Sequence, residues 1–224
     1  GALFPEPAGA WLERQDRGHA VRLGVKVAAI ARDGDGWLVE PGGNAPPERF
    51  DALVLATPAP VSAALLAPLP DAAELARQLG ALAHEPIATC YLQYAPGTRL
   101  ALPFYALLDE PEANRWGQFV FDRAQLDPGH DGLLAVVVSA AGEAANLPRE
   151  QLATAIASQL AQDFGRPELA APAWTQLITE KRATFSCVPG LVRPGNITPL
   201  PGLVLAGDYT ACDYPATLET AVRS

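Results

Sequence analysis

Gly207 and Asp208 are the residues of this chain whose types and position are best suited to hold a ligand. They follow an apolar run, Leu203 to Ala206, that predicts a short buried strand within the closing stretch LVLAGDYTACDYPATLETAVRS. Ligands of open α/β sheets bind beyond the carboxyl ends of the strands, so the Asp208 carboxylate is placed to accept hydrogen bonds from sugar or ribityl hydroxyl groups. Gly207 has no side chain and therefore lets a ligand approach the backbone closely.

A helix is predicted to follow this pair from about Ala216, with Pro215 just ahead of it. The free N–H groups of its first turn carry partial positive charge and favour an anion or an electron-rich carbonyl oxygen. A ligand that joins polyol hydroxyls to an acceptor-rich ring matches both features, and a flavin has both. A lone Gly-Asp pair is also common in turns and caps, so the downstream helix is what favours a ligand site.

No other set of residues points to a specific chemistry, and the catalytic residue stays unassigned. Cys90, Cys187 and Cys212 show no CxxC spacing and share no motif with the three isolated histidines, so neither a metal site nor a disulfide is expected. This cysteine usage fits a reducing cytosol and predicts a cytoplasmic protein. Lys181 and Arg182 face either a ligand or solvent, and the sequence leaves both interpretations open.

The charge balance argues against nucleic acid as a partner. The 224 residues include 16 basic and 25 acidic side chains, for a net charge of −9. Such a chain presents no positive surface to nucleic acid or to an anionic bilayer. The longest apolar run, Leu133 to Ala141, is shorter than the roughly 18 residues that a membrane-spanning helix requires.

Hydrophobic patterns predict the elements that position the site. Three β-rich runs near the start predict an antiparallel meander, and the last of them, DALVLAT, predicts a strand covered on both faces. Two helices are expected, from about 71 to 82 and from about 149 to 164. Strand patterns are expected at ATCYLQY, LPFYALL, GQFVFDR, LLAVVVS and WTQLITEKRATF, with LLAVVVS central in its sheet.

These elements divide into two interleaved parts. Residues 81–184 are expected to form a self-contained domain with a mixed β-sheet and helices, whereas 1–80 and 185–224 are expected to contribute to a second layer that needs a partner. Aromatic residues on the middle strands either line an apolar tunnel for a long substrate or belong to the core, and core is the commoner role. They are Phe104, Tyr105, Phe119 and Phe121.

The closing stretch resembles the C-terminal FAD motif of the amine oxidase and carotenoid desaturase superfamily. The closer resemblance is to the squalene-associated FAD-dependent desaturases, or hydroxysqualene dehydroxylases, and it is carried in order by LFPEPAGAWLE, FDALVLATPAPVSAALL, EKRATFSCVPGLVRPG and GDYTACDYPATLETAVRS. The resemblance implies an α/β plus α+β fold: the C-terminal portion of a two-domain, glutathione-reductase-like flavoenzyme. Its substrate domain has a mixed sheet, and its nucleotide-binding layer is incomplete.

Site residues are implied by the same resemblance. Asp208 bonds the ribityl chain, and the backbone N–H groups around Thr217 and Leu218 face the pyrimidine edge of the flavin. The backbone of Val27 pairs with adenine, and Thr57 lies beside the adenosine and pyrophosphate. Two positions, Asp213 and Thr220, depart from the family, which commonly has glycine there.

The family's N-terminal GxGxxG turn, which holds the pyrophosphate, is missing from the sequence. The chain also contains no methionine, so Gly1 is not expected to be a translation start. Both observations predict the C-terminal half of a flavoenzyme whose N-terminal half lies outside this sequence. Alone, this half is expected to hold FAD weakly or not at all and to be inactive.

The resemblance implies an enzyme that dehydroxylates hydroxysqualene to squalene in hopanoid synthesis. An apolar substrate of this kind implies that the intact enzyme contacts a membrane surface, peripherally at the inner membrane. Two alternatives stay open within the superfamily, a carotenoid desaturase and a flavin amine oxidase. A third, from another class, is a cofactor-free binding module in which the Gly-Asp turn holds something else.

Overall fold

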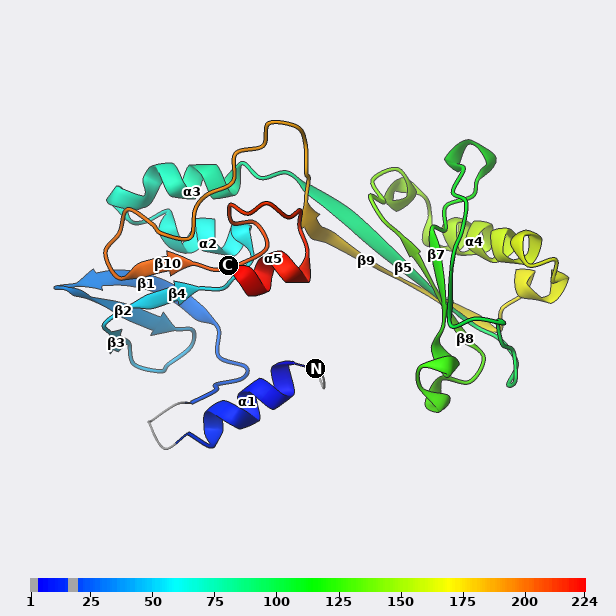
Figure 1. Ribbon diagram of the computed structural model, residues 1–224, viewed down its shortest axis with the longest axis horizontal. Helices are drawn as coiled ribbons and strands as arrows, with labels where there is room; N and C mark the ends of the chain where they lie inside the picture. Colours follow the sequence, from blue (N-terminus) through cyan, green and yellow to red (C-terminus); the bar gives the residue numbers. More distant parts are fainter. Residues whose placement is uncertain (1–3, 16–19) are drawn as a thin grey trace. The chain divides into compact units, whose positions relative to one another are not determined.

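A computed structural model of the chain describes residues 4–15 and 20–224, which fold as two units (Figure 1). Unit 1 contains the described residues up to Ala81 and those from Val192 to Ser224, and unit 2 contains Leu82–Leu191. Unit 1 is therefore built from two segments that are distant in the sequence. The elements of unit 1 are α1 (Pro5–Glu13), β1 (Val27–Asp33), β2 (Gly36–Pro41), β3 (Glu48–Phe50), β4 (Leu53–Leu55), α2 (Ala59–Leu66), the 3₁₀ turn η1 (Pro70–Ala72), α3 (Ala73–Gly80), β10 (Leu203–Leu205) and α5 (Leu218–Arg223).

The predicted antiparallel meander is confirmed only for its first two runs, which form β1 and β2; the third strand is β3, which comes mostly from the predicted turn before the third run. Gly34 adopts φ +61° in the turn between β1 and β2, where a residue without a side chain costs little. The third run contributes only Phe50 to this sheet, because β3 consists of Glu48–Phe50. The rest of that run leaves the meander and forms β4, which pairs in parallel with β10 at the register Val54↔Val204.

The prediction that β4 is covered on both faces is wrong. Leu55 is buried, but Val54, whose side chain points to the opposite face, is 64% exposed. The residues that the structure describes form only a two-stranded sheet here, with β10 beside β4. The face of β4 that carries Val54 borders a cavity instead of a packed layer.

Helices α2 and α3 pack against each other in unit 1 (Figure 1). The helix predicted over 71–82 is divided, because η1 occupies its first turn and α3 begins at Ala73. Leu66 and Leu79 are fully buried between the elements of this unit. Helices α2 and α3 thus contribute buried side chains to the core of unit 1.

Unit 2 is built on a five-stranded sheet in the order β6-β7-β8-β5-β9, and all of its pairings are antiparallel, so the sheet is not mixed as predicted. LLAVVVS forms β8, the middle strand, as predicted. The strands and the main helix are β5 (His84–Gln93), β6 (Phe104–Ala106), β7 (Phe119–Asp122), β8 (Leu133–Val138), α4 (Arg149–Asp163) and β9 (Trp174–Phe185). Five short 3₁₀ turns connect them, namely η2 (Pro111–Ala113), η3 (Arg123–Gln125), η4 (Pro128–His130), η5 (Ala144–Asn146) and η6 (Pro167–Ala170).

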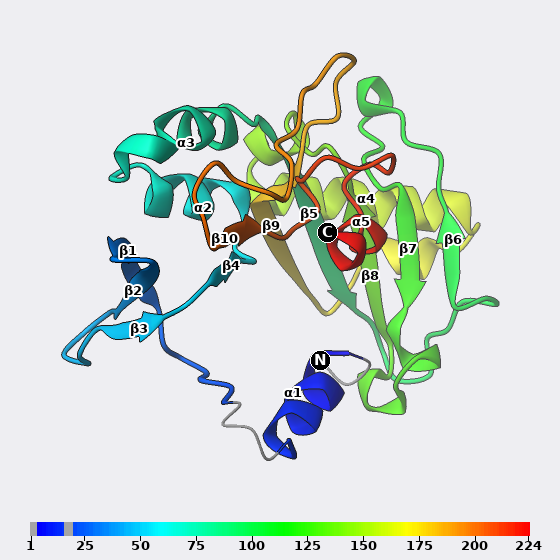
Figure 2. The ribbon, with the colours of Figure 1, turned by 60° about the vertical axis from the view of Figure 1, so that its left-hand side comes forward.

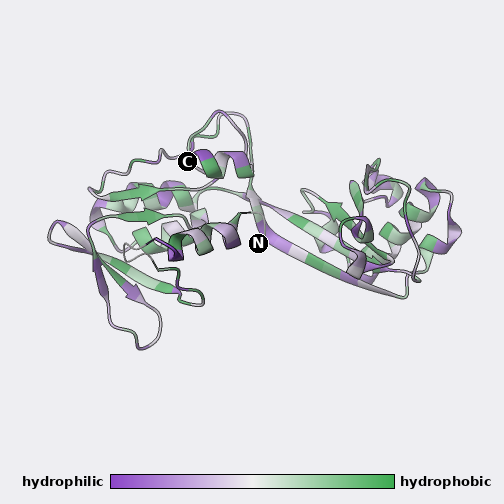
Figure 3. Ribbon diagram, turned by 60° about the horizontal axis from the view of Figure 1, so that its bottom comes forward, coloured by the Kyte–Doolittle hydropathy of each residue, from purple (hydrophilic) through white to green (hydrophobic). Residues whose placement is uncertain are grey.

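Helix α4 covers one face of this sheet, as Figure 2 shows. Leu152, Ile156 and Leu160 lie on one side of the helix and are fully buried against the strands. The helix ends before Gly165, whose φ of +60° suits a glycine at a C-terminal cap, so the predicted second helix is confirmed. A hydrophilic stretch on the long β5–β9 ribbon (Figure 3) coincides with exposed charges on β9, including Lys181 and Arg182.

Candidate functional site

Gly207 and Asp208 form a tight turn directly after β10. An added Cβ at Gly207 would lie 2.5 Å from Cε1 of the Tyr209 ring, so the turn requires a residue without a side chain there. The Gly207 N–H donates to the Ser224 hydroxyl at 2.9 Å, which ties the last residue of the chain to the turn. We call residues 207–212 the elbow. Its backbone is therefore held before any ligand arrives.

Tyr209 anchors the elbow inside unit 1. Its side chain is 2% exposed, and its hydroxyl lies 3.1 Å from the hydroxyl of Ser62, which is fully buried in α2. Ser62 in turn lies 2.7 Å from the Thr57 hydroxyl and donates to the Thr57 carbonyl at 3.3 Å. Burial raises the pKa of Tyr209, so this hydroxyl keeps its proton at neutral pH.

The segment before β10, which has no regular secondary structure around Arg193 and Pro194, holds the elbow from a second side. Arg193 donates to the carbonyl oxygens of Asp208, at 3.5 Å, and of Cys212. The Ala211 N–H donates to the carbonyl of Pro194 at 2.7 Å. The backbone of the elbow is thus fixed at several points, and these contacts leave the Asp208 side chain uncommitted.

The Asp208 carboxylate is half-buried, and none of the residues that the structure describes donates a hydrogen bond to it. Asp122 of unit 2 differs, because its carboxylate has internal hydrogen-bond donors. Asp122 is fully buried, and its carboxylate accepts from the N–H groups of Leu100 and Ala124 and from Gln125. A half-buried carboxylate without an internal partner fits the role of accepting hydrogen bonds from the hydroxyl groups of a bound ligand.

Helix α5 begins at Leu218, two residues later than predicted, with Thr217 as its N-cap. The Thr217 hydroxyl accepts from the Thr220 N–H at 3.2 Å, and the buried Thr220 hydroxyl donates to the Pro215 carbonyl at 2.6 Å. Thr220, where the family commonly has glycine, therefore fastens the turn that leads into the helix. The N–H groups of Leu218 and Glu219 have no acceptor within the described part of the chain, and Leu218 is 84% exposed.

Val27 and Thr57, which are far apart in the sequence, line the same cavity. This cavity encloses about 270 Å³ in unit 1, and apart from Thr57 its walls are apolar. The lining residues are Val27, Ile30, Val39, Phe50, Leu53, Val54, Leu55, Thr57 and Leu65. Apolar walls with one hydroxyl suit the faces of a flat heteroaromatic ring such as a purine. Unit 1 therefore fits FAD at both ends: an apolar cavity can take the adenosine, and the Asp208 carboxylate, which has no donor among the described residues, can accept hydrogen bonds from the ribityl chain.

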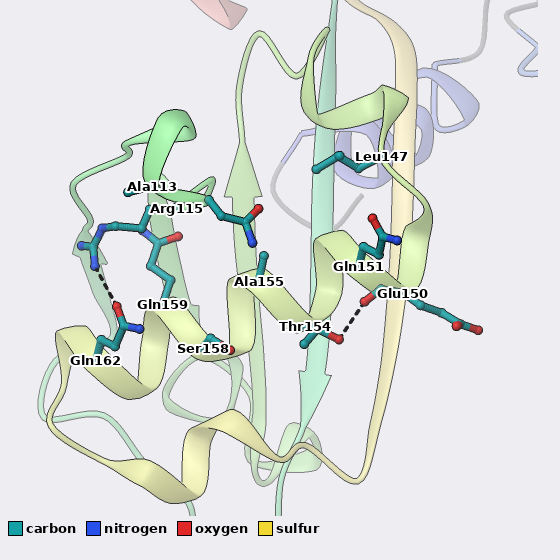
Figure 4. A pocket seen from close by; sticks show the side chains of 11 residues that line it. Ala113, Arg115, Leu147, Glu150, Gln151, Thr154, Ala155, Ser158, Gln159 and Gln162 are labelled. Carbon is teal, nitrogen blue, oxygen red and sulfur yellow. Dashed lines mark hydrogen bonds between the residues drawn. The ribbon is translucent and has the colours of Figure 1, made fainter.

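A second cavity of about 600 Å³ lies in unit 2 against α4, and it contains none of the predicted site residues (Figure 4). Arg115 forms one side, where it pairs with Asp163 at 2.6 Å and donates to Gln162 at 3.4 Å. Gln159 is buried beneath and bonds both the N–H and the carbonyl of Gly117. These side chains attach the loop after β6 to α4, so we interpret this part of the cavity as structural.

The face of the unit 2 sheet away from α4 carries a partly exposed apolar surface. Phe104 and Phe121 stack there with ring centroids 5.8 Å apart. The register Phe119↔Val137 and Thr89↔Ile178 places four further side chains in one row across neighbouring strands. Tyr105 lies on the opposite face, where its ring meets Phe164 edge-on at 5.0 Å. Of the four aromatics considered for a tunnel, Tyr105 thus belongs to the core.

The described residues contain neither a metal-ligand cluster nor a membrane-spanning helix. Within ranges 4–15 and 20–224 no three His, Cys, Asp or Glu side chains gather as they would around a metal ion. In the same ranges no helix has both the length and the apolar character needed to cross a membrane. Cys90 is buried, Cys212 is half-buried and Cys187 is exposed, and all three are free thiols.

Sequence reasoning missed three residues that shape the site, namely Ser62, Arg193 and Tyr209. Tyr209 adjoins the Gly-Asp pair, and its position next to a predicted ligand-binding turn was the available signal. Ser62 and Arg193 give no such signal. Ser62 meets Tyr209 across 147 positions of sequence, and only the folded chain brings them together.

Comparison with known proteins connects this geometry to a family. Residues 8–224 match the flavin containing amine oxidoreductases. The whole chain is 32% identical to hydroxysqualene dehydroxylase of Rhodopseudomonas palustris (strain ATCC BAA-98 / CGA009) and covers 48% of it. Hydroxysqualene dehydroxylase of Sinorhizobium fredii (strain NBRC 101917 / NGR234) is 39% identical over 41% of this chain and 22% of that protein. The chain thus spans about half the length of the first relative.

The fold is also similar to that of a solved structure, cyclohexylamine oxidase from Brevibacterium oxydans IH-35A. The TM-score is 0.64 at 17% identity, and the match covers 88% of this chain and 45% of that one. At this identity the likeness concerns the fold alone. The sequence match, in contrast, extends over almost the whole chain, elbow included. The chain belongs to the family of flavin containing amine oxidoreductases.

Proposed function

We propose that this chain is the C-terminal half of an FAD-dependent oxidoreductase that converts hydroxysqualene to squalene. The observation that carries the proposal is the identity of 32% with hydroxysqualene dehydroxylase over the whole chain. The shared region includes the elbow, where Asp208 has an uncommitted carboxylate. The family match supports FAD as the cofactor.

Unit 1 is the FAD-binding part in this proposal. The cavity beside Val27 and Thr57 takes the adenosine, with the Val27 backbone against the adenine ring. Asp208 and Gly207 meet the ribityl chain at the end of β10. Pro215, Ala216, Thr217 and Leu218 place the free N–H groups of α5 at the pyrimidine edge of the ring. A partial positive charge there stabilises negative charge on a reduced flavin.

The N-terminal half completes this unit with the strand, GxGxxG turn and helix of a glutathione-reductase-like nucleotide-binding layer. The exposed apolar side chains of unit 1 support this, because large exposed apolar patches mark interaction surfaces. Val54, Val61, Leu218 and Val222 are all exposed. The described β4–β10 pair would then be part of a larger parallel sheet.

Unit 2 supplies the substrate-binding surface. Its open sheet face carries Phe104, Phe119 and Ile178, which are exposed, beside half-buried Phe121 and Val137. A surface of this kind matches a long isoprenoid better than an amine, for which acidic groups among the aromatics would be expected. Because such a substrate partitions into lipid, we propose that the intact enzyme, a cytoplasmic protein, meets it at the surface of the inner membrane.

When bound and reduced, FAD would supply the hydride that replaces the hydroxyl group of hydroxysqualene, and the hydroxyl leaves as water after taking up a proton. The residues of this chain bind and orient the cofactor and the substrate. Asp208 fixes the ribityl chain, and the apolar face of unit 2 excludes water from the substrate. A carotenoid desaturase would instead remove hydrogen and produce reduced flavin.

The test uses the intact enzyme, in which this chain is joined to its N-terminal half. The flavin is reduced chemically without oxygen, hydroxysqualene is added, and the products are analysed by gas chromatography and mass spectrometry. Squalene formation with reoxidation of the flavin absorbance supports the proposal. No squalene from hydroxysqualene, together with reduction of the flavin by phytoene or by an amine when the assay is started from the oxidised enzyme, would overturn it in favour of the corresponding alternative.

A further inference from the structure

The two proposed ends of the FAD site are joined by a chain of three hydroxyl groups. Thr57 lines the adenosine cavity, and Tyr209 directly follows Asp208. Ser62 lies between them, 2.7 Å from the Thr57 hydroxyl and 3.1 Å from that of Tyr209. Ser62 is fully buried and Tyr209 is nearly so, which shields the contact between them from solvent, whereas the contact with Thr57 is partly buried.

One assignment of hydrogens satisfies every contact in this chain of hydroxyls. A serine hydroxyl has one hydrogen to donate and two lone pairs to accept. Ser62 donates to the Thr57 carbonyl and accepts from Tyr209 and Thr57. With its hydrogen turned inward, the Thr57 hydroxyl presents lone pairs to the cavity that it lines.

The Tyr209 ring also constrains the residue before Asp208, which is Gly207. It packs against Gly207 so closely that a Cβ there would lie 2.5 Å from the ring. The Tyr209 ring therefore constrains Gly207, the residue before Asp208, and the Tyr209 hydroxyl fixes the residue after Asp208 to Ser62. A shift of Tyr209 away from Ser62 would move Asp208 with it, because the two residues are consecutive.

We propose that Tyr209 and Ser62 are positioning residues that hold the adenosine end and the ribityl end of the FAD site at a fixed separation. This inference rests on the proposed function of unit 1. Tyr209 sets the place of the carboxylate that bonds the ribityl chain. Ser62 fixes the positions of both the Tyr209 hydroxyl and the Thr57 hydroxyl. The two residues consequently differ in which part of the ligand they affect.

The experiment compares Tyr209→Phe, Ser62→Ala and the double variant in the intact apoenzyme, well below each melting temperature. Dissociation constants are measured for FAD, by flavin fluorescence, and for ADP, by calorimetry. ADP contains the adenosine and pyrophosphate but no ribityl chain. Tyr94→Phe is the matched control, because it removes another buried tyrosine hydroxyl, one that donates to the Leu169 carbonyl in unit 2.

Tyr209→Phe is expected to weaken FAD binding about 3- to 10-fold and to leave ADP binding unchanged. Ser62→Ala is expected to weaken both, and the double variant to match Ser62→Ala because the two act through one contact. Tyr94→Phe lowers the melting temperature without changing either dissociation constant.

Wild-type affinity for FAD in both single variants would overturn the inference, as would equal losses for FAD and ADP in Tyr209→Phe. If Tyr209→Phe does not fold, Ser62→Ala still tests the same contact. Failure of the wild-type intact enzyme to bind FAD is a separate result, and it would overturn the proposed function itself.

Discussion

The hydroxyl oxygens of Ser62 and Tyr209 lie 3.1 Å apart, although 147 positions separate them in the sequence. Ser62 belongs to the first turns of α2, which follows β4, and Tyr209 belongs to the elbow, which follows β10. The two parallel strands thus lead into a helix and a turn whose side chains are bonded to each other. The elbow is consequently organised by unit 1 itself, and its side chains can be tested one at a time.

Gly207→Ala is expected to destabilise the protein by about 1–3 kcal/mol, because the new methyl group would overlap the Tyr209 ring. Urea unfolding followed by circular dichroism measures the change. Gly195→Ala is the control in the same unit, since nothing lies within 4 Å of its Cβ position. The control should change stability by less than about 0.5 kcal/mol. Equal stability of the two variants would show that the ring does not constrain Gly207.

Arg193→Gln is expected to weaken FAD binding about 10-fold, because the carbonyl oxygens of Asp208 and Cys212 lose their donor and the elbow loosens. Fluorescence titration of the intact apoenzyme gives the dissociation constant. Arg77→Gln removes one positive charge elsewhere in unit 1, where Arg77 pairs with Glu74 on the surface of α3. If both variants lost affinity equally, net charge and not the elbow would be responsible.

The three thiols are expected to react in a fixed order with a maleimide. Cys187 is exposed and reacts first, Cys212 is half-buried in the elbow and reacts more slowly, and Cys90 reacts only after unfolding. FAD should slow the labelling of Cys212 and leave that of Cys187 unchanged, which peptide mass spectrometry can follow. Equal protection of both thiols, or of neither, would contradict the placement of the cofactor at the elbow.

Unit 2 is expected to lose stability as the pH rises from about 9 towards about 12. Burial raises the pKa of Cys90 to about 12 and raises that of Tyr94 as well. Both pKa values are higher in the folded than in the unfolded chain, so the stabilisation is complete below the unfolded values and declines above them. One such group lowers the free energy of unfolding by about 1.4 kcal/mol per pH unit in that window.

Urea midpoints at several pH values measure this decline. Cys90→Ala should flatten it, whereas Cys187→Ala, which removes an exposed thiol, should keep the slope of the wild type. A Cys90→Ala variant with an unchanged slope would mean that the buried thiol does not contribute.

Local signals predicted much of this fold. Pro148 and Gly165 mark the ends of α4, and the continuous apolar run of β8 identifies the middle strand of its sheet. The exposure of Val54 was not predictable in the same way, because an apolar strand residue carries no information about what lies against it. The pleat of β6, in contrast, could have separated Tyr105 from Phe104, since consecutive strand residues point to opposite faces.

The site was predictable in part. Gly207 and Asp208 stand out by type and position after an apolar run, whereas Thr217 and Leu218 were implied only by the family resemblance. The contact of Ser62 with Tyr209 depends on the pairing of β4 with β10, which no local pattern specifies. The shared cavity of Val27 and Thr57 depends on the same tertiary arrangement.

The most direct measurement is the affinity of the intact apoenzyme for FAD with and without the Asp208 carboxylate. Asp208→Asn keeps the shape of the side chain, and its melting temperature without FAD should equal that of the wild type, because the carboxylate has no donor among the residues the structure describes. Asp213→Asn, an exposed carboxylate close by in the sequence, is the control. FAD affinity is predicted to fall about 10- to 100-fold in Asp208→Asn alone. An Asp208→Asn enzyme that binds FAD as tightly as the wild type would contradict the assignment of the elbow as the flavin site.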